Sequence, residues 1–360
     1  MGCRVFAPVT AAMSEANIKS PGLTGRADTC LAQGAIAGSS FIGDPIVRKM
    51  DHLCTTGDVP RGAVDEGQEV KSDHRREIMN PVGYADHETY LWQLDQEALD
   101  RTEFLVEPQA HHQHLDVGCG TGGFTCRALL PLNRPATRIV GADVSPSMLE
   151  YARRHNNQGS IAYELLDITS SPEVSAFVAK NGQFQRVYSF LCFHLVPDLT
   201  VAFQNISDLL TTDGECLVTA CVTNPALDAW LDVHAMPEWK TWVADPRVVF
   251  PSSIYFNYGG TMAQIEEETR KCVVHAGLEC IACEVIECTW LMRDVGHIFE
   301  LYSDCFSVGA DVPASDKDAV KAAYIKRLRP RVEETARGCE MRVRIYRVHA
   351  TPHRQVTADH

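Results

Sequence analysis

The residues best suited to chemistry stand in one short segment, a glycine run with an acidic residue before it. From His114 to Gly123 the segment reads HLDVGCGTGG. The apolar residues Leu115 and Val117 predict a buried strand, and a helix is expected to begin near Phe124. A strand, a glycine turn and a helix start in succession present free backbone N–H groups and the positive end of a helix dipole. The segment therefore predicts a site for an anionic or polar ligand.

Two cofactor classes fit the spacing of these glycines. Gly118, Gly120 and Gly123 satisfy the dinucleotide pattern G-x-G-x-x-G. Asp116 opens a second pattern, D-x-G-x-G-x-G, whose third glycine is Gly122. That second pattern is the first motif of methyltransferases that use S-adenosylmethionine (SAM). The glycines alone leave both cofactors open.

Strands and helices are expected to alternate after the glycine segment, which implies a parallel, doubly wound α/β sheet. The predicted strands are 138–142, 161–166, 184–190 and 215–222. The predicted helices between them are 146–155, 174–179 and 199–210. Apolar residues at helical spacing also predict a helix ahead of the sheet, over 88–107.

Beyond residue 223 the alternation ends, and the chain is expected to complete the sheet and cover it with a helical cap. Two late strands are predicted, over 279–290 and 341–348. The cap insertions are expected at about 225–262 and 295–337. The folded domain is thus predicted over 79–350, with a poorly ordered leader over 1–78, rich in Gly, Ser, Thr, Asp and Pro, and a tail over 351–360.

Composition excludes several classes of partner. The 360 residues carry a formal net charge of −14 without a sustained basic stripe, which argues against nucleic acid or an anionic membrane surface. No apolar run is long enough to span a bilayer, and no signal peptide is recognisable, so the cytosol is the predicted location. The oligomeric state is not predictable from these features.

Fourteen cysteines raise the question of disulfides or zinc. Without a secretory signal the thiols are expected to be reduced, and several stand at core positions. Cys280-x-x-Cys283, with Cys288 nearby, is the tightest group. It lacks a second C-x-x-C and lies in a segment typical of a strand, so no metal site is predicted.

Three aspartates decide between the cofactors. Asp143, after the second strand, serves ribose hydroxyls in either case. Asp116 precedes the first glycine, where its carboxylate can orient the turn and accept a hydrogen bond from the ammonium of SAM. Asp167 ends the third strand, placed for an adenine amino group, with Ile168 packing on the ring. Since the chain also lacks the Tyr-x-x-x-Lys of many dehydrogenases, SAM is the predicted cofactor.

With these motifs the chain resembles the class I SAM-dependent methyltransferases, and among them the arthropod juvenile hormone acid O-methyltransferases. The resemblance runs from about residue 79 to 348. It rests on these segments: Met79-Asn80, Tyr84, Gln93, 116–120, 141–145, Met148, 166–168, 189–194, 202–206, 213–217 and Asn224-Pro225. It implies a seven-stranded Rossmann-like sheet. The cofactor-binding residues that it implies are Asp116, Gly118, Cys119, Gly120, Gly122, Asp143, Val144, Met148, Asp167 and Ile168.

On the acceptor side the resemblance implies Gln93 and His194 as the catalytic residues. The implied reaction methylates the carboxylate of a small hydrophobic acid, resembling farnesoic acid or juvenile hormone acid. A carboxylate is ionised at neutral pH and needs no general base. The family usually has a tryptophan after the histidine, where this chain has Leu195. There are two alternatives to this reaction: methylation of another small molecule, and SAM binding without catalysis.

Overall fold

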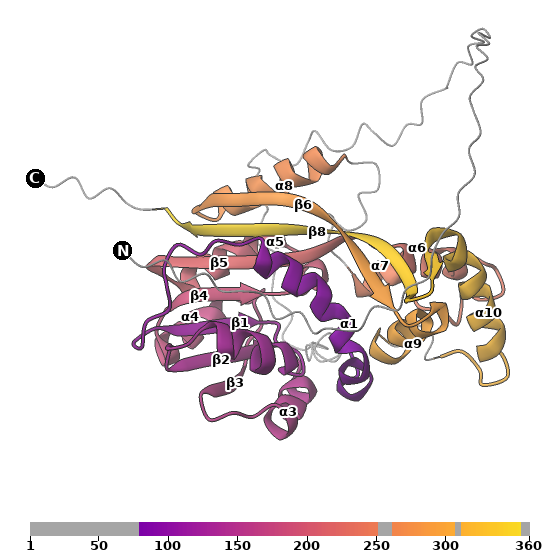
Figure 1. Ribbon diagram of the computed structural model, residues 1–360, viewed down its shortest axis with the longest axis horizontal. Helices are drawn as coiled ribbons and strands as arrows, with labels where there is room; N and C mark the ends of the chain where they lie inside the picture. Colours follow the sequence, from indigo (N-terminus) through magenta and orange to yellow (C-terminus); the bar gives the residue numbers. More distant parts are fainter. Residues whose placement is uncertain (1–78, 251–260, 307–310, 354–360) are drawn as a thin grey trace, which may run out of the picture. The chain divides into compact units, whose positions relative to one another are not determined.

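The computed structural model describes residues 79–250, 261–306 and 311–353 (Figure 1). The predicted leader over 1–78 lies outside the described residues, as do 354–360 of the predicted tail. Of the helices described, none is long and apolar enough to cross a membrane.

One mixed sheet organises the described chain. Seven strands follow the order β3-β2-β1-β4-β5-β8-β6, and the short β7 pairs with β8 outside this path. The strands are β1 Gln113–Val117, β2 Arg138–Asp143, β3 Ile161–Leu165, β4 Phe184–Ser189, β5 Leu210–Thr223, β6 Leu278–Met292, β7 Glu333–Thr335 and β8 Gly338–Pro352. Strands β1 to β5 run parallel, whereas β8 runs antiparallel to β5 and β6. The doubly wound, seven-stranded α/β sheet predicted from the sequence is confirmed.

Helices cover both faces of this sheet. They are α1 Pro81–Asp100, the π-helix η2 Thr125–Leu129, α2 Leu130–Leu132, α3 Pro146–His155, α4 Ser171–Asn181, the 3-10 helix η3 Phe193–Leu195, α5 Leu199–Leu209, α6 Pro225–His234, α7 Pro246–Val249, α8 Met262–His275, α9 Val295–Phe306, α10 Lys317–Leu328 and the 3-10 helix η4 Arg329–Arg331. Helices α4, α5 and α8 pack on one face in the largest apolar cluster. Residues of α1, α3, η2 and α2 pack on the other.

A separate apolar cluster lies beyond the end of the parallel strands. Helices α6, α9 and α10, here called the cap, pack there with the distal parts of β6 and β8 (Figure 1). Its largest fully buried side chains include Trp230, Trp290 and Tyr324. The predicted insertions around 225–262 and 295–337 contain these helices. Residues 251–260 and 307–310 of these insertions lie outside the description.

Several element bounds differ from the predictions for identifiable reasons. Helix α1 begins at Pro81 rather than at 88, because the Asn80 side chain accepts a hydrogen bond from Val82 N and caps the helix. The helical stretch predicted over 295–337 divides into α9 and α10 and ends in strand β7, whose three residues pair with β8. Short-range periodicity does not report this pairing, because it depends on β8.

Two caps hold helix starts at the edge of the sheet where the parallel strands end. Ser145 caps α3 by accepting a hydrogen bond from Met148 N at 3.2 Å. Asp198 caps α5 in the same way through Val201 N at 3.1 Å. Each cap fixes where a strand-to-helix loop ends, and so where the polar residues of that loop lie.

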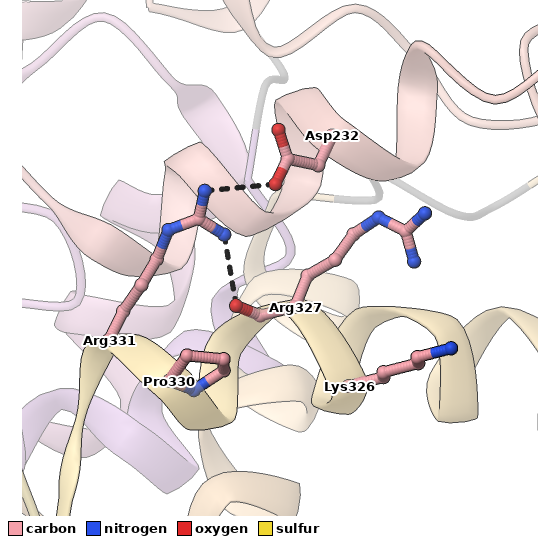
Figure 2. Close-up of a pocket in the computed structure, with 5 residues that line it drawn as sticks. All are labelled: Asp232, Lys326, Arg327, Pro330 and Arg331. Carbon is pink, nitrogen blue, oxygen red and sulfur yellow. Dashed lines mark hydrogen bonds and ion pairs between the residues drawn. The ribbon is translucent and has the colours of Figure 1, made fainter.

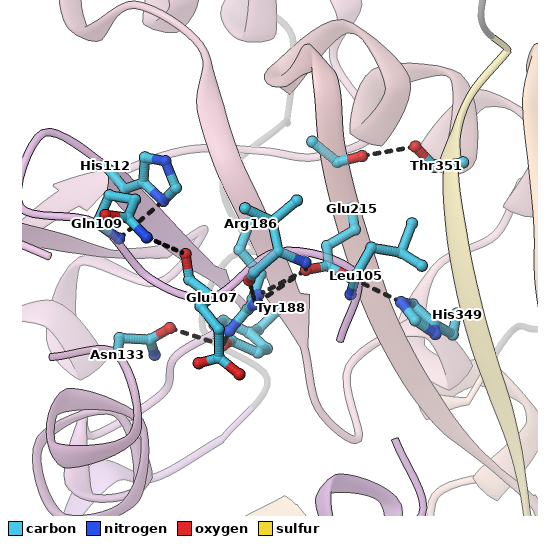
Figure 3. Close-up of polar contacts among 12 residues, drawn as sticks. Leu105, Glu107, Gln109, His112, Asn133, Arg186, Tyr188, Glu215, His349 and Thr351 are labelled. Atoms are coloured by element: carbon cyan, nitrogen blue, oxygen red, sulfur yellow. Dashed lines mark hydrogen bonds and ion pairs between the residues drawn. The ribbon is translucent and has the colours of Figure 1, made fainter. Parts of the chain in front are cut away.

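A buried polar cluster ties β4, β5 and β8 together (Figure 3). Glu215 on β5 accepts hydrogen bonds from the Arg186 guanidinium at 2.9 Å and from Leu105 N at 2.8 Å. Its second oxygen also lies 2.8 Å from His349 Nε2. All three side chains in the cluster are almost wholly buried. Because these partners come from distant parts of the chain, the sequence pattern did not reveal them.

Candidate functional site

The glycine turn after β1 packs against the end of β2 through backbone hydrogen bonds. Gly118 N and Cys119 N both donate to Ala142 O, at 2.7 and 3.0 Å. Gly118, Gly120 and Gly122 all have positive φ angles. The turn therefore has the left-handed backbone that glycine adopts without strain.

Gly118 also lacks room for a side chain. A Cβ at this position would lie 2.5 Å from Cys192 Sγ and 2.7 Å from Cys192 Cβ. Cys192 follows β4, so the loop after β4 lies directly against the glycine turn. This contact brings the ends of β1 and β4 into one site.

Asp143 organises the turn from the end of β2. One carboxylate oxygen accepts from Gly120 N and the other from Ser145 N, each at 2.9 Å. Carboxylates hydrogen-bonded to two backbone amides are well oriented. The sequence assigned Asp143 to a ligand, and the structure adds that it also shapes the loop.

Asp116 lies beneath the turn and is 3 % exposed. Its side chain accepts a hydrogen bond from Thr125 Oγ1 at 2.6 Å. Burial raises the pKa of Asp116 to about 7, the Thr125 hydrogen bond opposes this rise, and the charge of Asp143 adds to it. A nearby cation would favour its ionised form.

The strand-end aspartates gather around the Cys192 thiol. Burial, together with the charges of Asp143, Asp116 and Asp167, raises the pKa of Cys192 to about 12, while a Ser189 hydrogen bond opposes the rise. The structure thus brings together the ends of β1, β2 and β4 with the segment after β3, as the parallel topology predicts.

The remaining cofactor-side residues lie around this core of the site. Asp167 is held by Thr169, whose backbone N–H and hydroxyl donate to it at 2.9 and 2.6 Å. Val144 is half-buried between Asp143 and the α3 cap. Met148 and Ile168 are buried, Ile168 within the apolar cluster that α4 and α5 share. Their contacts with an adenine ring stay a prediction.

Helix α1 covers the glycine turn with two acidic residues. Glu88 accepts a short hydrogen bond from Thr121 Oγ1, and a Cβ at Gly123 would collide with its carboxylate. Asp95, two turns further along, is 5 % exposed, and its Oδ1 has no hydrogen-bond partner in the part of the chain that the structure describes. Burial, and after it the charge of Asp116, raises the pKa of Asp95 well above its usual range. Helix α1 therefore places a buried carboxyl oxygen that lacks a hydrogen bond to any described residue near Asp116.

His194 lies in η3, directly after the loop that contacts the glycine turn. It is 8 % exposed, and its ring stacks on Phe250 with centroids 5.6 Å apart. Cys221 N donates a hydrogen bond to His194 Nδ1 at 3.3 Å. Burial lowers the pKa of His194 to about 4. The ring is therefore neutral at neutral pH, with its proton on Nε2.

Gln93 lies on the exposed side of α1 and binds the edge of the sheet. Its Nε2 donates to Leu291 O at 3.0 Å, and its Oε1 accepts from Leu291 N at 3.3 Å. Both ends of its amide thus anchor α1 to β6. A hydrogen bond from Nε2 to an acceptor would use its second proton or require this anchor to open, and the catalytic role of Gln93 stays a prediction.

Partly buried apolar side chains from α1, from the residues after β4 and from the cap pack against the cap cluster, and are here called the apolar boundary. They are Tyr84, Tyr90, Leu91, Leu191, Leu195, Trp239 and Phe299. Leu191 has a φ of 44°, a strained backbone for a leucine, and its N–H donates to Thr219 Oγ1 at 3.1 Å. Strain of this kind concentrates at functional sites, and residue types alone do not reveal it.

A hollow of about 450 Å³ lies elsewhere, on the surface of the cap where α6 meets α10 and η4 (Figure 2). Arg331 spans it, donating to Asp232 Oδ2 and to Arg327 O, each at 2.9 Å. Lys326 and Pro330 complete its wall. No residue of the glycine turn or of η3 lines this hollow, so it is separate from the strand-end site.

Residues 108–275 match a family model described as "Methyltransferase domain". Residues 108–275 form a class I SAM-dependent methyltransferase domain. The match agrees with the acidic residue before the glycine turn, which the dinucleotide pattern does not require. SAM is the cofactor of this domain family.

Curated relatives of the methyltransferase domain include carboxyl O-methyltransferases. "Juvenile hormone acid O-methyltransferase" of Bombyx mori is 31% identical over 129 residues, 36% of this chain and 45% of the relative. The protein of the same description from Drosophila melanogaster is 32% identical over 135 residues, covering 36% and 44%. "Malonyl-[acyl-carrier protein] O-methyltransferase" of Acetivibrio thermocellus is 34% identical over 100 residues, covering 28% and 32%. The chain spans less than half the length of these relatives.

The site of the methyltransferase domain fits a cationic cofactor. SAM carries an ammonium and a sulfonium, and the site offers two buried carboxyl groups that form no ion pair with the described residues. Asp116 and Asp95 are these groups, and Asp95 Oδ1 has no partner among the described residues. A cation bound here would compensate the cost of burying their charges. Asp95 would thus hold the cofactor beside the residues that the sequence identified.

Asp95→Asn is expected to weaken SAM binding and to stabilise the cofactor-free protein. The raised pKa of Asp95 means that ionisation costs folding stability, and the cost grows as the pH rises above the unfolded value of about 3.9. Asparagine removes this cost and the attraction for a cation. The dissociation constant should rise roughly tenfold, about 1.4 kcal/mol, by calorimetry. In urea denaturation, the free energy of unfolding of Asp95→Asn should exceed that of the wild type, and this excess should be larger at pH 7 than at pH 4.

Asp86→Asn is the matched control, since Asp86 lies exposed on the same helix. It should change neither quantity. Unchanged SAM affinity in Asp95→Asn would mean that Asp95 does not face the cofactor.

Sequence reasoning overlooked Asp95, although a signal was present. Asp95 stands four residues after Leu91 and four before Leu99, within the apolar stripe of α1. An acidic residue on the buried stripe of a helix is unusual unless it is paired.

Proposed function

We propose that this chain transfers the methyl group of SAM to the carboxylate of a small hydrophobic acid, resembling farnesoic acid or juvenile hormone acid. The methyltransferase domain and its carboxyl-methylating relatives support the reaction class. The acceptor is inferred from the chemistry of His194 and its surroundings.

The protonation of His194 carries the proposal. Since its Nδ1 accepts a hydrogen bond from Cys221 N, the proton of the neutral ring is on Nε2. Such a ring cannot take a proton from a hydroxyl or amine without becoming a buried cation, which the lowered pKa disfavours. It can donate a hydrogen bond from Nε2. An acceptor that arrives already deprotonated, such as a carboxylate, matches this property.

Catalysis then depends on orientation and exclusion of water. When bound, SAM supplies an electrophilic methyl group on a sulfonium. Asp116 and Asp95 would hold the cationic part of the cofactor, and the turn that Asp143 organises would hold the rest. His194 would orient the acceptor carboxylate for an in-line displacement. No proton needs to move, so positioning in a dry site supplies most of the rate.

The apolar boundary supports a hydrophobic acceptor. Leu195 and Leu191 flank the turn that contains His194, and both pack against the cap cluster. Tyr84 and Tyr90 approach from α1 as part of the same apolar set. A short apolar chain attached to a carboxylate would pack against these side chains.

The test is methyl-ester formation from labelled SAM and a panel of acids, compared between the wild type and His194→Ala. The wild type should methylate isoprenoid acids in preference to small di- and tricarboxylates. His194→Ala should lower kcat on the order of 100-fold, because an orienting donor is lost, and leave the SAM dissociation constant unchanged. His194→Gln, which keeps a donor amide, should retain more activity.

His275→Ala, an exposed histidine at the end of α8, is the control and should behave as the wild type. Transfer only to small polyacids would refute the hydrophobic acceptor. SAM binding without transfer to any acceptor would favour a non-catalytic protein. A fall in rate at low pH that disappears in His194→Ala would indicate that His194 acts as a base.

A further inference from the structure

Two cysteines outside the methyltransferase site are brought together by an irregularity in β6. Residues three apart on a regular strand point to opposite faces of the sheet. Between Cys280 and Ala282 the register with β8 shifts, so that Cys280 pairs with Ala350 and Cys283 with Val348. A bulge with one extra residue restores a common face. Both cysteines accordingly pack against the apolar cluster under α8.

The two thiols differ in access and in acidity. Cys280 is half-buried, whereas Cys283 is 5 % exposed. The hydrogen bond from the Cys283 thiol, with the nearby Arg270 guanidinium, lowers the pKa of Cys280 to about 7 against the effect of burial. The same hydrogen bond, with burial, raises the pKa of Cys283.

Helix α8 holds the surroundings of this pair in place. Arg270 Nη2 donates to Cys283 O at 3.1 Å. Glu266 O, 3.5 Å from Cys283 Sγ, is a second acceptor for the single proton of the Cys283 thiol, and Glu266 Oε1 accepts from Val285 N at 2.8 Å. A cation next to an accessible thiol, with a second thiol behind it, is the arrangement of reactive dithiols.

We propose that Cys280 and Cys283 form a redox-active dithiol, which a hydroperoxide converts into a disulfide. The proposal goes beyond methyl transfer and does not depend on it. Cys280 and Cys283 pair with Ala350 and Val348, which are two residues apart on β8, and their thiols are in hydrogen-bonding contact, as a disulfide between them requires. The bulge therefore allows the bond without separating β6 from β8.

The chemistry has two steps. The Cys280 thiolate attacks the terminal peroxide oxygen and the O–O bond breaks. The other oxygen leaves as hydroxide from hydrogen peroxide, or as alkoxide from an organic hydroperoxide, and is protonated to water or to an alcohol. The Cys283 sulfur then attacks the resulting Cys280 sulfenic acid, an S–S bond forms, and the S–O bond breaks. The Cys283 proton leaves with that oxygen as water. Two electrons pass from the two sulfurs to the peroxide.

Peptide mapping of the reduced full-length protein, treated with hydrogen peroxide and then alkylated, tests the proposal. A linked Cys280–Cys283 peptide that has lost two hydrogens is expected before other cysteines are oxidised. In Cys283→Ser, which lacks the second thiol, a dimedone adduct of Cys280 is expected instead. The rate of Cys280 alkylation should rise with pH around a midpoint below that of an ordinary thiol, and Arg270→Gln should move that midpoint upward.

Two other cysteines serve as internal controls. Cys272 is a half-buried cysteine on α8, and Cys288 lies buried further along β6 with a pKa raised by burial to about 11. Cys272→Ser should leave the linked peptide unchanged. Oxidation of Cys280 no faster than of Cys272, or a Cys280 sulfenic acid that persists with Cys283 present, would overturn the proposal.

Discussion

Gly118→Ala is expected to raise the dissociation constant for SAM by about 100-fold, the equivalent of about 2.8 kcal/mol. Gly118 has a φ of 75°, a backbone conformation that strains an alanine. The added Cβ would also lie 2.5 Å from Cys192 Sγ. Relief of this clash requires the glycine turn to move away from the loop after β4. Because Asp143 binds the same turn through Gly120 N, the movement should displace residues that are predicted to bind the cofactor, and calorimetry should measure it directly as lost affinity.

A double variant separates the two causes. Cys192→Gly removes both Cys192 atoms that the new methyl group would meet, but leaves the backbone strain. Gly118→Ala combined with Cys192→Gly should recover part of the affinity. Gly159→Ala is the neutral control, since a Cβ there meets nothing within 4 Å. Wild-type affinity in Gly118→Ala, with an unchanged Tm, would contradict the close approach.

Glu215→Gln is expected to lower the free energy of unfolding by about 3–5 kcal/mol, the usual cost of leaving a buried charge without its partner. Glu215 pairs with Arg186, and the side chains are 2% and 4% exposed. A neutral amide leaves the Arg186 cation buried without a counter-charge. It also presents an amide nitrogen where one carboxylate oxygen now accepts. Urea denaturation at pH 7 should measure this loss.

The same cluster predicts acid sensitivity. Burial by itself would raise the pKa of Glu215, yet hydrogen bonds from His349 and Leu105 N, with Arg186, hold it below its usual range. A lowered folded pKa contributes stability that is present above the unfolded value of about 4.3 and is lost as the pH falls below it. The difference between the wild type and Glu215→Gln should therefore shrink below pH 4.

Glu287→Gln provides the matched control for Glu215. Glu287 also binds two cations, Arg342 and Arg344, but on the exposed edge of the sheet. Ion pairs in water contribute little, so this variant should unfold as the wild type does. Equal losses in both variants would mean that burial does not determine the strength of the Glu215 cluster.

Much of the fold was predictable because its causes are local. The helix start at Pro146 follows from Ser145 and the proline, and the strands of the parallel half are apolar runs bounded by turn residues. Helix α1 and strand β7 were harder to place. The first depends on a cap outside the apolar pattern, and the second on pairing with a distant strand.

The candidate site divides in the same way. The sequence by itself determined the glycine turn and its aspartates, Asp116, Asp143 and Asp167, because the ends of neighbouring parallel strands necessarily meet at one edge. Which acidic residue lacks a partner, and which nitrogen of His194 carries the proton, depended on packing. Asp95 lies on the buried side of helix α1, and His194 Nδ1 accepts its hydrogen bond from Cys221 N on β5.

The tertiary structure alone decided the features that depend on burial. The partners and acidities of Glu215, Asp95 and the pair Cys280 and Cys283 do not follow from their residue types or spacing. Their properties come from groups far along the chain, such as His349 for Glu215 and Arg270 for the cysteines. The spacing of residue types along the chain specifies which backbone conformation, helix, strand or turn, a residue adopts. The cost of a charge depends on which atoms replace the water around it, and only the folded chain brings those atoms together.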